Sequence, residues 1–307
     1  MQQGMTAIQK YLDTLPECME EITISFMDYD DNNKNRIDLS RFVGLNKFSC
    51  IGCNLTTLPI LPDSVSELDC SSNKITEIIQ LPNNLTLIRC FGNAIERINV
   101  LPPRIRFVNC MYNNLTTLPI FPDSMEELYC SHNHITELGR LTENFTHIIC
   151  IDNQLTHIPL LPPKIKHFDF EHNNVSSVQS FPPQLQYINC AYNDIQILPE
   201  IPSTVIYFQC NNNPIYQVIK TSNTNTKIID NANIIHKFRF TYYIIKFKSK
   251  FKKWLWEYVR EPRIRNIFSP ENIFSKLSAL SSNNDNDIDS LLTQTIRDFE
   301  NKLYNTV

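Results

Sequence analysis

The chain repeats itself every twenty residues. Positions 81–100 are LPNNLTLIRCFGNAIERINV, positions 101–120 are LPPRIRFVNCMYNNLTTLPI and positions 121–140 are FPDSMEELYCSHNHITELGR, so each block has a cysteine at its tenth place. The same columns run through nine consecutive units without an insertion between residues 42 and 219. A fixed period of this length is typical of a solenoid, in which each unit packs only against its neighbours.

Each unit has the pattern LPxxLxxLxCxxNxLTxLPx. The alternation in LxxLxC predicts a short β-strand whose apolar side chains point inward, and equivalent strands should pair in parallel. Two columns of polar or sulfur-bearing residues would then lie inside the stack, and we interpret both as structural. The cysteine column is Cys50, Cys70, Cys90, Cys110, Cys130, Cys150, Cys190 and Cys210, and the asparagine column is Asn73, Asn93, Asn113, Asn133, Asn153, Asn173, Asn193 and Asn213.

The asparagine column follows the strand, where the chain must turn. Its amides can bond backbone groups that the turn buries. On the opposite side of the unit, paired prolines favour extended or polyproline conformation, and twenty residues leave little room for a helix. The predicted fold is an α/β solenoid with parallel strands on its concave face and extended segments on its convex face.

The unit matches the signature LxxLxLxxN/CxL of leucine-rich repeats. It resembles the repeats of bacterial type III secreted effectors, LPxLPxxLxxLxVxxNxL, with cysteine in place of valine. The asparagine-, isoleucine- and lysine-rich units are more similar to leucine-rich-repeat proteins of giant, mimivirus-like DNA viruses of amoebae, and WLWEYVREPRIRNIFSPENI (254–273) resembles a helical tail of such proteins. The resemblance implies a viral protein that acts in an infected host cell, and it supplies no catalytic motif.

The ends differ from the repeats, so three regions are expected. They are an N-terminal cap (1–41), the solenoid (42–219) and a helical C-terminal region (220–307) that seals the open end of the stack. In the cap, LPECMEEITIS is a half-unit in which Ile22 and Ile24 take inward strand positions. After the solenoid, TSNTNTKIIDNANI is predicted to be a polar join, with amphipathic helices beyond it.

The cap also contains DYDDNNKNRIDLSR, which has some features of a calcium-binding loop. In the register that begins at Asp30, however, the twelfth place holds Arg41 and the central glycine is replaced by Asn35. A calcium loop of the EF-hand type needs glutamate and glycine at these places. We therefore expect a solvated loop without a metal.

The cysteine column is expected to be inert. Parallel Cβ vectors of stacked cysteines do not suit a disulfide, and Phe170 takes the cysteine place in one unit, where a ring can fill core space but cannot bind a metal. The only CxxC pair, Cys50 and Cys53, lacks the second pair of a zinc site. Cys18, in the cap, is expected in the core as well.

The histidines form a second group to consider. Six of the seven lie between His132 and His172. His147 and His167 share a column on the concave face, whereas His132, Asp152 and His172 share a column at the strand exit. A surface metal site or pH-sensitive patch is one alternative, and ordinary exposed polar side chains are the other. We favour the second alternative and expect neither metal nor cofactor.

The concave sheet face is the expected binding surface, because solenoids bind partners there. Its outward positions are rich in aromatic residues, methionine and arginine, which are enriched at protein interfaces. An exposed apolar patch usually indicates a partner, although some side chains could pad neighbouring strands or be covered by the tail. The predicted partner-binding residues are Leu87, Arg89, Phe91, Phe107, Met111, Tyr112, Tyr129, Ile149, Ile151, Tyr187 and Tyr207.

The C-terminal region offers a less favoured contact site. Residues 231–265 include many lysines and arginines around Trp254 and Trp256, and such a helix can lie on an anionic membrane or on nucleic acid. An ordinary capping helix with a solvated basic face is the alternative that we favour. We predict an unknown host or viral protein as the partner and no small-molecule substrate.

Composition narrows the class of protein further. A net charge of -4 excludes the whole chain as an electrostatic nucleic-acid binder. No apolar run is long enough for a membrane span, and the N-terminus lacks a secretory signal, so we expect an intracellular protein in the host cytoplasm. Enzymatic activity is not expected. The similar bacterial effectors sometimes carry a ubiquitin-ligase domain with a catalytic cysteine, but here no cysteine follows Cys210.

Overall fold

A computed structural model describes residues 7–27, 37–220 and 225–246. The chain divides into two compact units after Phe238. The first unit holds all of the sheet, and the described part of the second unit is the end of helix α3 (Asn225–Lys246). The helices predicted beyond residue 246 and the polar loop over residues 28–36 lie outside the described residues.

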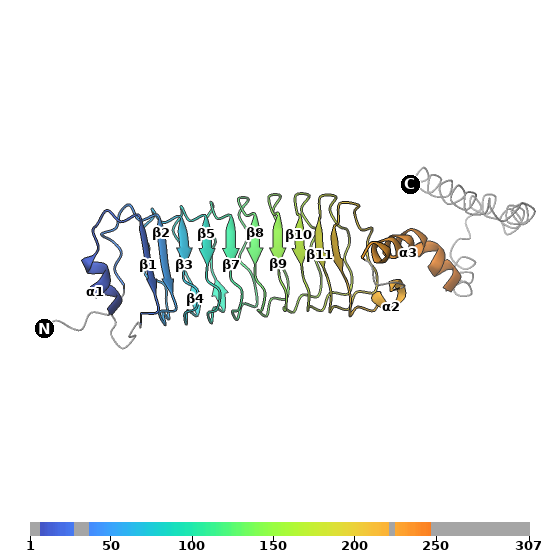
Figure 1. The fold of residues 1–307 in the computed structure, drawn as a ribbon, viewed down its shortest axis with the longest axis horizontal. Coiled ribbons are helices and arrows are strands. Elements are labelled where there is room, and N and C mark those ends of the chain that lie inside the picture. Colours follow the sequence, from blue (N-terminus) through green and yellow to red (C-terminus); the bar gives the residue numbers. More distant parts are fainter. Residues whose placement is uncertain (1–6, 28–36, 221–224, 247–307) are drawn as a thin grey trace, which may run out of the picture. The chain divides into compact units, whose positions relative to one another are not determined.

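The main element of the first unit is a parallel sheet of ten strands (Figure 1). Each strand pairs only with the preceding and following strand of this sheet, in chain order. The strands are β1 (Glu21–Ser25), β2 (Lys47–Ile51), β3 (Glu67–Asp69), β5 (Leu87–Arg89), β7 (Phe107–Asn109), β8 (Glu127–Tyr129), β9 (His147–Ile149), β10 (His167–Asp169), β11 (Tyr187–Asn189) and β12 (Tyr207–Gln209).

The register of the sheet follows the sequence period. From β2 onward, every residue lies opposite the residue twenty positions later, as Leu87 lies opposite Phe107. The half-unit in the cap supplies β1, in which Ile22 lies opposite Phe48 and Ile24 opposite Cys50. The offset at this pair is larger because the polar segment around residues 28–36 is inserted between the two strands.

The opposite side of each unit is mostly extended, as the prolines predict. Two short segments, β4 (Glu77–Ile78) and β6 (Arg97–Ile98), form a parallel pair there. A turn precedes most strands, in which the proline carbonyl accepts a hydrogen bond from the N–H three residues later. For example, the Ile105 N–H donates to the Pro102 carbonyl at 3.2 Å. The turn directs the chain back into the sheet, and this explains the proline column.

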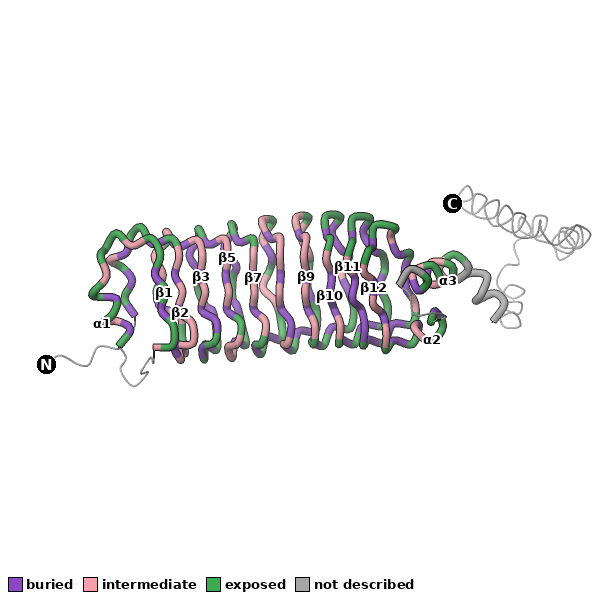
Figure 2. The backbone as a smooth tube through the Cα atoms, in the orientation of Figure 1, coloured by how far each residue is buried: buried purple, intermediate pink, exposed green. Residues whose placement is uncertain are grey.

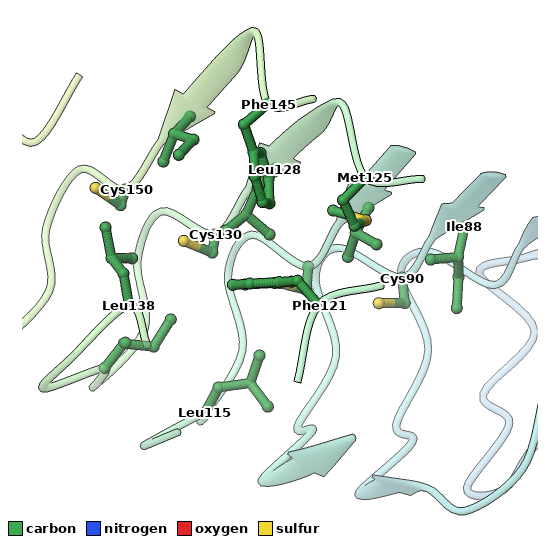
Figure 3. Packing of buried hydrophobic residues seen from close by; sticks show 14 of the residues in the cluster. Ile88, Cys90, Leu115, Phe121, Met125, Leu128, Cys130, Leu138, Phe145 and Cys150 are labelled. Atoms are coloured by element: carbon green, nitrogen blue, oxygen red, sulfur yellow. The ribbon is translucent and has the colours of Figure 1, made fainter. Parts of the chain in front are cut away.

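Buried residues recur in every unit of the sheet (Figure 2), and their apolar side chains belong to one continuous core cluster. Figure 3 shows Cys90, Cys130 and Cys150, which directly follow β5, β8 and β9, beside leucine, methionine and phenylalanine side chains of the same core. Phe170 fills the cysteine position of its unit, is fully buried and stacks on Phe168 at 4.7 Å between ring centroids. The column therefore packs as part of the core.

The asparagine column joins neighbouring units through both ends of its amide. Asn113 accepts a hydrogen bond from the N–H of Ile95 at 2.9 Å. Its Nδ2 donates to the carbonyls of Cys90 and Cys110, at 3.0 and 3.1 Å. The same set recurs along the column, so backbone groups buried by each turn find partners in the next unit.

Two helices differ from the sequence prediction. Helix α1 (Ala7–Thr14), which was not predicted, buries Ile8 and Leu12 in the cap. The predicted polar join was wrong, because α3 begins at Asn225 within it. Ile228 and Ala232 of α3 are buried, and the amide of Asn233 bonds both backbone groups of Ile201. Tertiary contacts thus override the low helix propensity of asparagine and threonine.

The last repeat also ends differently from the pattern. Helix α2 (Tyr216–Ile219) takes the place of the extended segment that earlier units have there. As a result Ile219 is fully buried, whereas Val218, at the end of an apolar column of the repeat, is exposed.

Candidate partner-binding face

The strand face is the surface formed by the outward side chains of the sheet. In each unit these are the first and third residues of the strand and the residue two places after its end, for example Leu87, Arg89 and Phe91. It corresponds to the predicted concave face. Inward positions such as Ile88 and Cys90 are fully buried, whereas none of the eleven predicted binding residues is buried. Phe91 is 38% exposed, and Tyr112, which lies just beyond the strand, is 55% exposed.

A central apolar patch covers the strand face from β5 to β9. Its members are Leu87, Phe91, Phe107, Met111, Tyr129, Ile149 and Ile151. The Arg89 guanidinium lies over the Phe107 ring at 5.3 Å from its centroid, and the Phe107 and Tyr129 rings lie 5.2 Å apart. The structure thus brings predicted residues of three strands into one cluster with an aromatic centre.

An aromatic stack continues from β9 to β12. The His147 and His167 rings are 5.8 Å apart, His167 stacks on Tyr187 at 3.9 Å, and Tyr187 stacks on Tyr207 at 4.3 Å with only 4° between the planes. His167 was not among the predicted binding residues, although its place in the column of Tyr187 was readable from the repeat. The two tyrosines are joined to the rest of the face through it.

Burial shifts the protonation equilibria of this part of the strand face. Asp169 is 5% exposed, and burial raises its pKa to about 6 even though the Glu171 N–H and the Asn189 amide donate hydrogen bonds to it. Burial, and then the neighbouring His147, lowers the pKa of His167. Burial also raises the pKa of Tyr129 to about 12, with Glu127 adding to the effect. At neutral pH we therefore expect a neutral His167 beside an ionised Asp169.

A separate row of side chains lies at the strand exit. Every residue of this column from Gly52 to Asn212 has a positive φ, a conformation that glycine and asparagine adopt most readily. Tyr112 nevertheless occupies it and stacks on His132 at 4.1 Å, and Nδ1 of His132 lies 2.8 Å from Oδ2 of Asp152. A polar hollow of about 420 Å³ adjoins these three residues.

The histidines on the strand face and those at the strand exit are not arranged as metal ligands. In the described ranges, no three histidine, cysteine, aspartate or glutamate side chains are grouped so that they could hold a metal ion. The ring nitrogens of His147 and His172 lie 4.0 Å from Glu127 and Glu171, which is the distance of a weak ion pair.

The cysteine column has no reactive member. All eight of its thiols are buried and none forms a disulfide. Burial raises the pKa of Cys110 and of Cys210 to about 12. A thiol attacks as its thiolate, so these groups are unreactive at neutral pH. The prediction for Cys18 was wrong, because its side chain is exposed. Cys18 lies in the turn between α1 and β1, where the half-unit has no inward position for it.

Comparisons with known proteins place the fold. No protein-family model matches the sequence, and no curated protein matches it. YopM, a leucine-rich effector protein from Yersinia pestis, is 21% identical with a TM-score of 0.54, over 63% of this chain and 61% of that one. The functional domain of InlJ from Listeria monocytogenes, described as including a cysteine ladder, is 26% identical with a TM-score of 0.51, over 61% and 44% of the two chains.

A further similar structure is YopM from Yersinia enterocolitica, 27% identical with a TM-score of 0.49, over 56% of this chain and 43% of that one. The chain therefore spans between 43% and 61% of the length of these three structures. The parallel sheet, the twenty-residue register and the likeness to YopM define the fold as a leucine-rich-repeat solenoid. Within the described residues, no helix is both long and apolar enough to cross a bilayer.

Proposed function

We propose that the protein recognises another protein through the strand face and has no catalytic activity of its own. One observation carries the proposal: seven apolar or aromatic side chains of four successive strands, β5 to β9, lie on the strand face, and each of them is partly or largely exposed. Patches of this kind on a surface usually meet a partner, and aromatic side chains and arginine supply most of the binding energy at interfaces.

Catalysis has no support among the described side chains. The thiols of the cysteine column are buried, and the one strongly shifted carboxyl group, Asp169, accepts hydrogen bonds from its neighbours instead of activating a nucleophile. Adaptor roles remain as the second candidate, in which residues 231–265 tether the repeat to a membrane or nucleic acid, or the repeat serves a ubiquitin-ligase-type enzyme. The resemblance of the repeats and of residues 254–273 supports a viral protein in the cytoplasm of an infected cell, with a host or viral partner.

The proposal is tested by affinity purification with a variant in which Phe91, Phe107 and Tyr129 are changed to serine. We expect specific partners to be lost from this variant. A matched control changes Val100, Ile120 and Leu160, which are exposed apolar side chains on the opposite side of the units, to serine. If both variants retain the partners of the unchanged chain, the strand face is not the binding surface.

A further inference from the structure

Charge is unevenly distributed over the strand face. From β3 to β12, its side chains include five carboxylates but only one lysine or arginine, Arg89. The carboxylates are Glu67, Asp69, Glu127, Asp169 and Glu171. The strand face is therefore more acidic than the chain as a whole, in which 32 acidic residues are offset by 28 basic ones.

The carboxylates bracket the central apolar patch. Glu67 and Asp69 belong to β3, on one side of the patch, and Asp169 and Glu171 belong to β10 and its exit, on the other side. Glu127 lies between them on β8. With neighbouring strands about 4.8 Å apart, the two acidic groups are separated by about 24 Å.

Few positively charged side chains lie close to these carboxylates. Glu127 accepts a hydrogen bond from the Tyr129 hydroxyl at 3.0 Å, and Glu171 accepts one from the Asn189 amide at 2.8 Å. Among the described side chains, neither forms an ion pair with a lysine or arginine. Among the described residues, a lysine approaches only at the β3 end, where Lys47 lies 3.7 Å from Glu67. At the other carboxylates the nearest groups that can carry a positive charge are His147 and His172, each 4.0 Å from a glutamate. Elsewhere in the sheet a full pair does form, between Arg106 and Glu126 at 2.8 Å, just outside the strand face.

We propose that the strand face binds an extended segment of a partner protein that has an apolar or aromatic centre and a basic side chain on each side. The inference rests on the proposed function and names the chemistry of its partner. A basic side chain at either end would meet a carboxylate and an aromatic edge or face, and the apolar centre would cover Phe91, Phe107 and Tyr129. Nucleic acid is disfavoured, because its phosphates would face the same carboxylates.

The spacing makes the proposal specific. An extended chain advances about 3.3 Å per residue, so about seven residues span the 24 Å between the two acidic groups. Because Asp169 is nearly buried, a cation that approaches it would stabilise a carboxylate that burial disfavours. Glu171, which is less buried, would make the direct contact.

The test uses the whole chain and a display library of random peptides of about sixteen residues, twice the length needed to span the acidic groups. We expect enriched peptides to carry two lysines or arginines about seven positions apart around an apolar centre. A representative peptide should bind the E67Q/E171Q variant about three- to tenfold more weakly, and the difference should shrink at high salt. The matched control, E96Q/E137Q, removes the same charge from exposed positions off the strand face and should bind as the unchanged chain does.

The outcomes separate this inference from the proposed function. Peptides that need Phe91 and Phe107 but show no basic flanks, or that bind E67Q/E171Q unchanged, would overturn the inference and leave the proposed function intact. Peptides that bind equally well after Phe91 and Phe107 are changed to serine, or a failure to enrich any peptide, would contradict both. Circular dichroism of each variant confirms that a lost interaction does not reflect unfolding.

Discussion

At the scale of single residues, the asparagine column contributes most to the stability of the stack. The Asn113 amide bonds one N–H and three carbonyls that belong to the backbone of two successive units, and the residue is 6% exposed. No solvent molecule can readily replace it, so its hydrogen bonds have to be made within the protein. An alanine there would leave these groups buried without a partner.

We therefore expect Asn113→Ala to lower the free energy of unfolding by about 2–4 kcal/mol, since each unsatisfied buried group costs about 1–3 kcal/mol. Urea denaturation followed by circular dichroism measures the change. Asn114→Ala is the matched control, because this neighbouring amide is exposed and should change stability by less than about 0.5 kcal/mol. If the two variants lose the same free energy of unfolding, the asparagine column is not what stabilises the turn.

Asp169 gives a prediction about pH. Its pKa is raised to about 6 from an ordinary 3.8, so the folded state binds a proton that the unfolded state does not bind between these values. Its contribution to stability is therefore greatest below pH 3.8 and is lost as the pH rises through about 6. His167, whose pKa is lowered, acts in the opposite direction, because its contribution is present above its ordinary value of 6.5 and is lost as the pH falls.

Asp169→Asn should remove the pH dependence of stability that Asp169 causes. At pH 7 we expect the variant to be more stable by about 1 kcal/mol, because it no longer buries a charge. Below pH 4 the advantage should vanish, since the native carboxyl group is then neutral. Urea denaturation at a series of pH values tests this, and a stability difference that stays constant from pH 4 to pH 7 would contradict it.

At the scale of elements, the repeat determined what could be predicted. Strands, register and the inward columns followed from the period, because every unit repeats the same evidence. Helix α1 and the start of α3 lie outside the period and were missed, although Ile8 and Leu12 have helical spacing and Pro16 follows the end of α1. The start of α3 could not be predicted from its local sequence, because burial of Ile228 against the last unit favours the helix there.

The strand-exit column shows a further limit of sequence analysis. Gly52, Gly92 and Asn212 share this column, and their residue types are the available signal for a left-handed backbone. Tyr112 and Tyr192 conceal that signal, because an aromatic side chain seldom adopts a positive φ. Their stacking on His132 and His172 involves a residue twenty positions away, so only the register shows why the conformation is tolerated.

The cysteine column predicts how the thiols react. In the native protein, Cys18 should react rapidly with a thiol reagent, and the buried thiols should react only as the chain unfolds, because burial keeps them protonated and inaccessible. Labelling followed by mass spectrometry counts the fast thiols. Cys18→Ser should abolish the fast phase without changing the slow one. Rapid modification of several cysteines in this variant would mean that the column is open to solvent.

At the scale of the whole molecule, each repeat unit interacts mainly with the unit before it and the unit after it. Each strand from β2 to β12 pairs only with its immediate neighbours in the sheet. The side-chain amide of Asn133 bonds its own unit and the preceding one, and its backbone N–H bonds the following one. Stability in such an array is approximately a sum over units and the interfaces between them. The strand face grows in the same way, so a unit could be removed from the stack without a change in the conformation of the others.

Deletion of residues 114–133 tests this property. It joins Asn113 to His134, removes one period and restores every column, so we expect a folded chain with an unchanged strand signal per residue and a lower unfolding midpoint. Deletion of residues 114–123 is the control, because half a period places apolar side chains in the turn and asparagines in the core, and it should prevent cooperative unfolding. Circular dichroism and urea denaturation distinguish the two. If both deletions behave alike, contacts beyond neighbouring units hold the stack together.

Because the twenty-residue deletion also removes Glu127 and Tyr129 from the strand face, its folded product would show whether partner binding needs the centre of the apolar patch or only its ends.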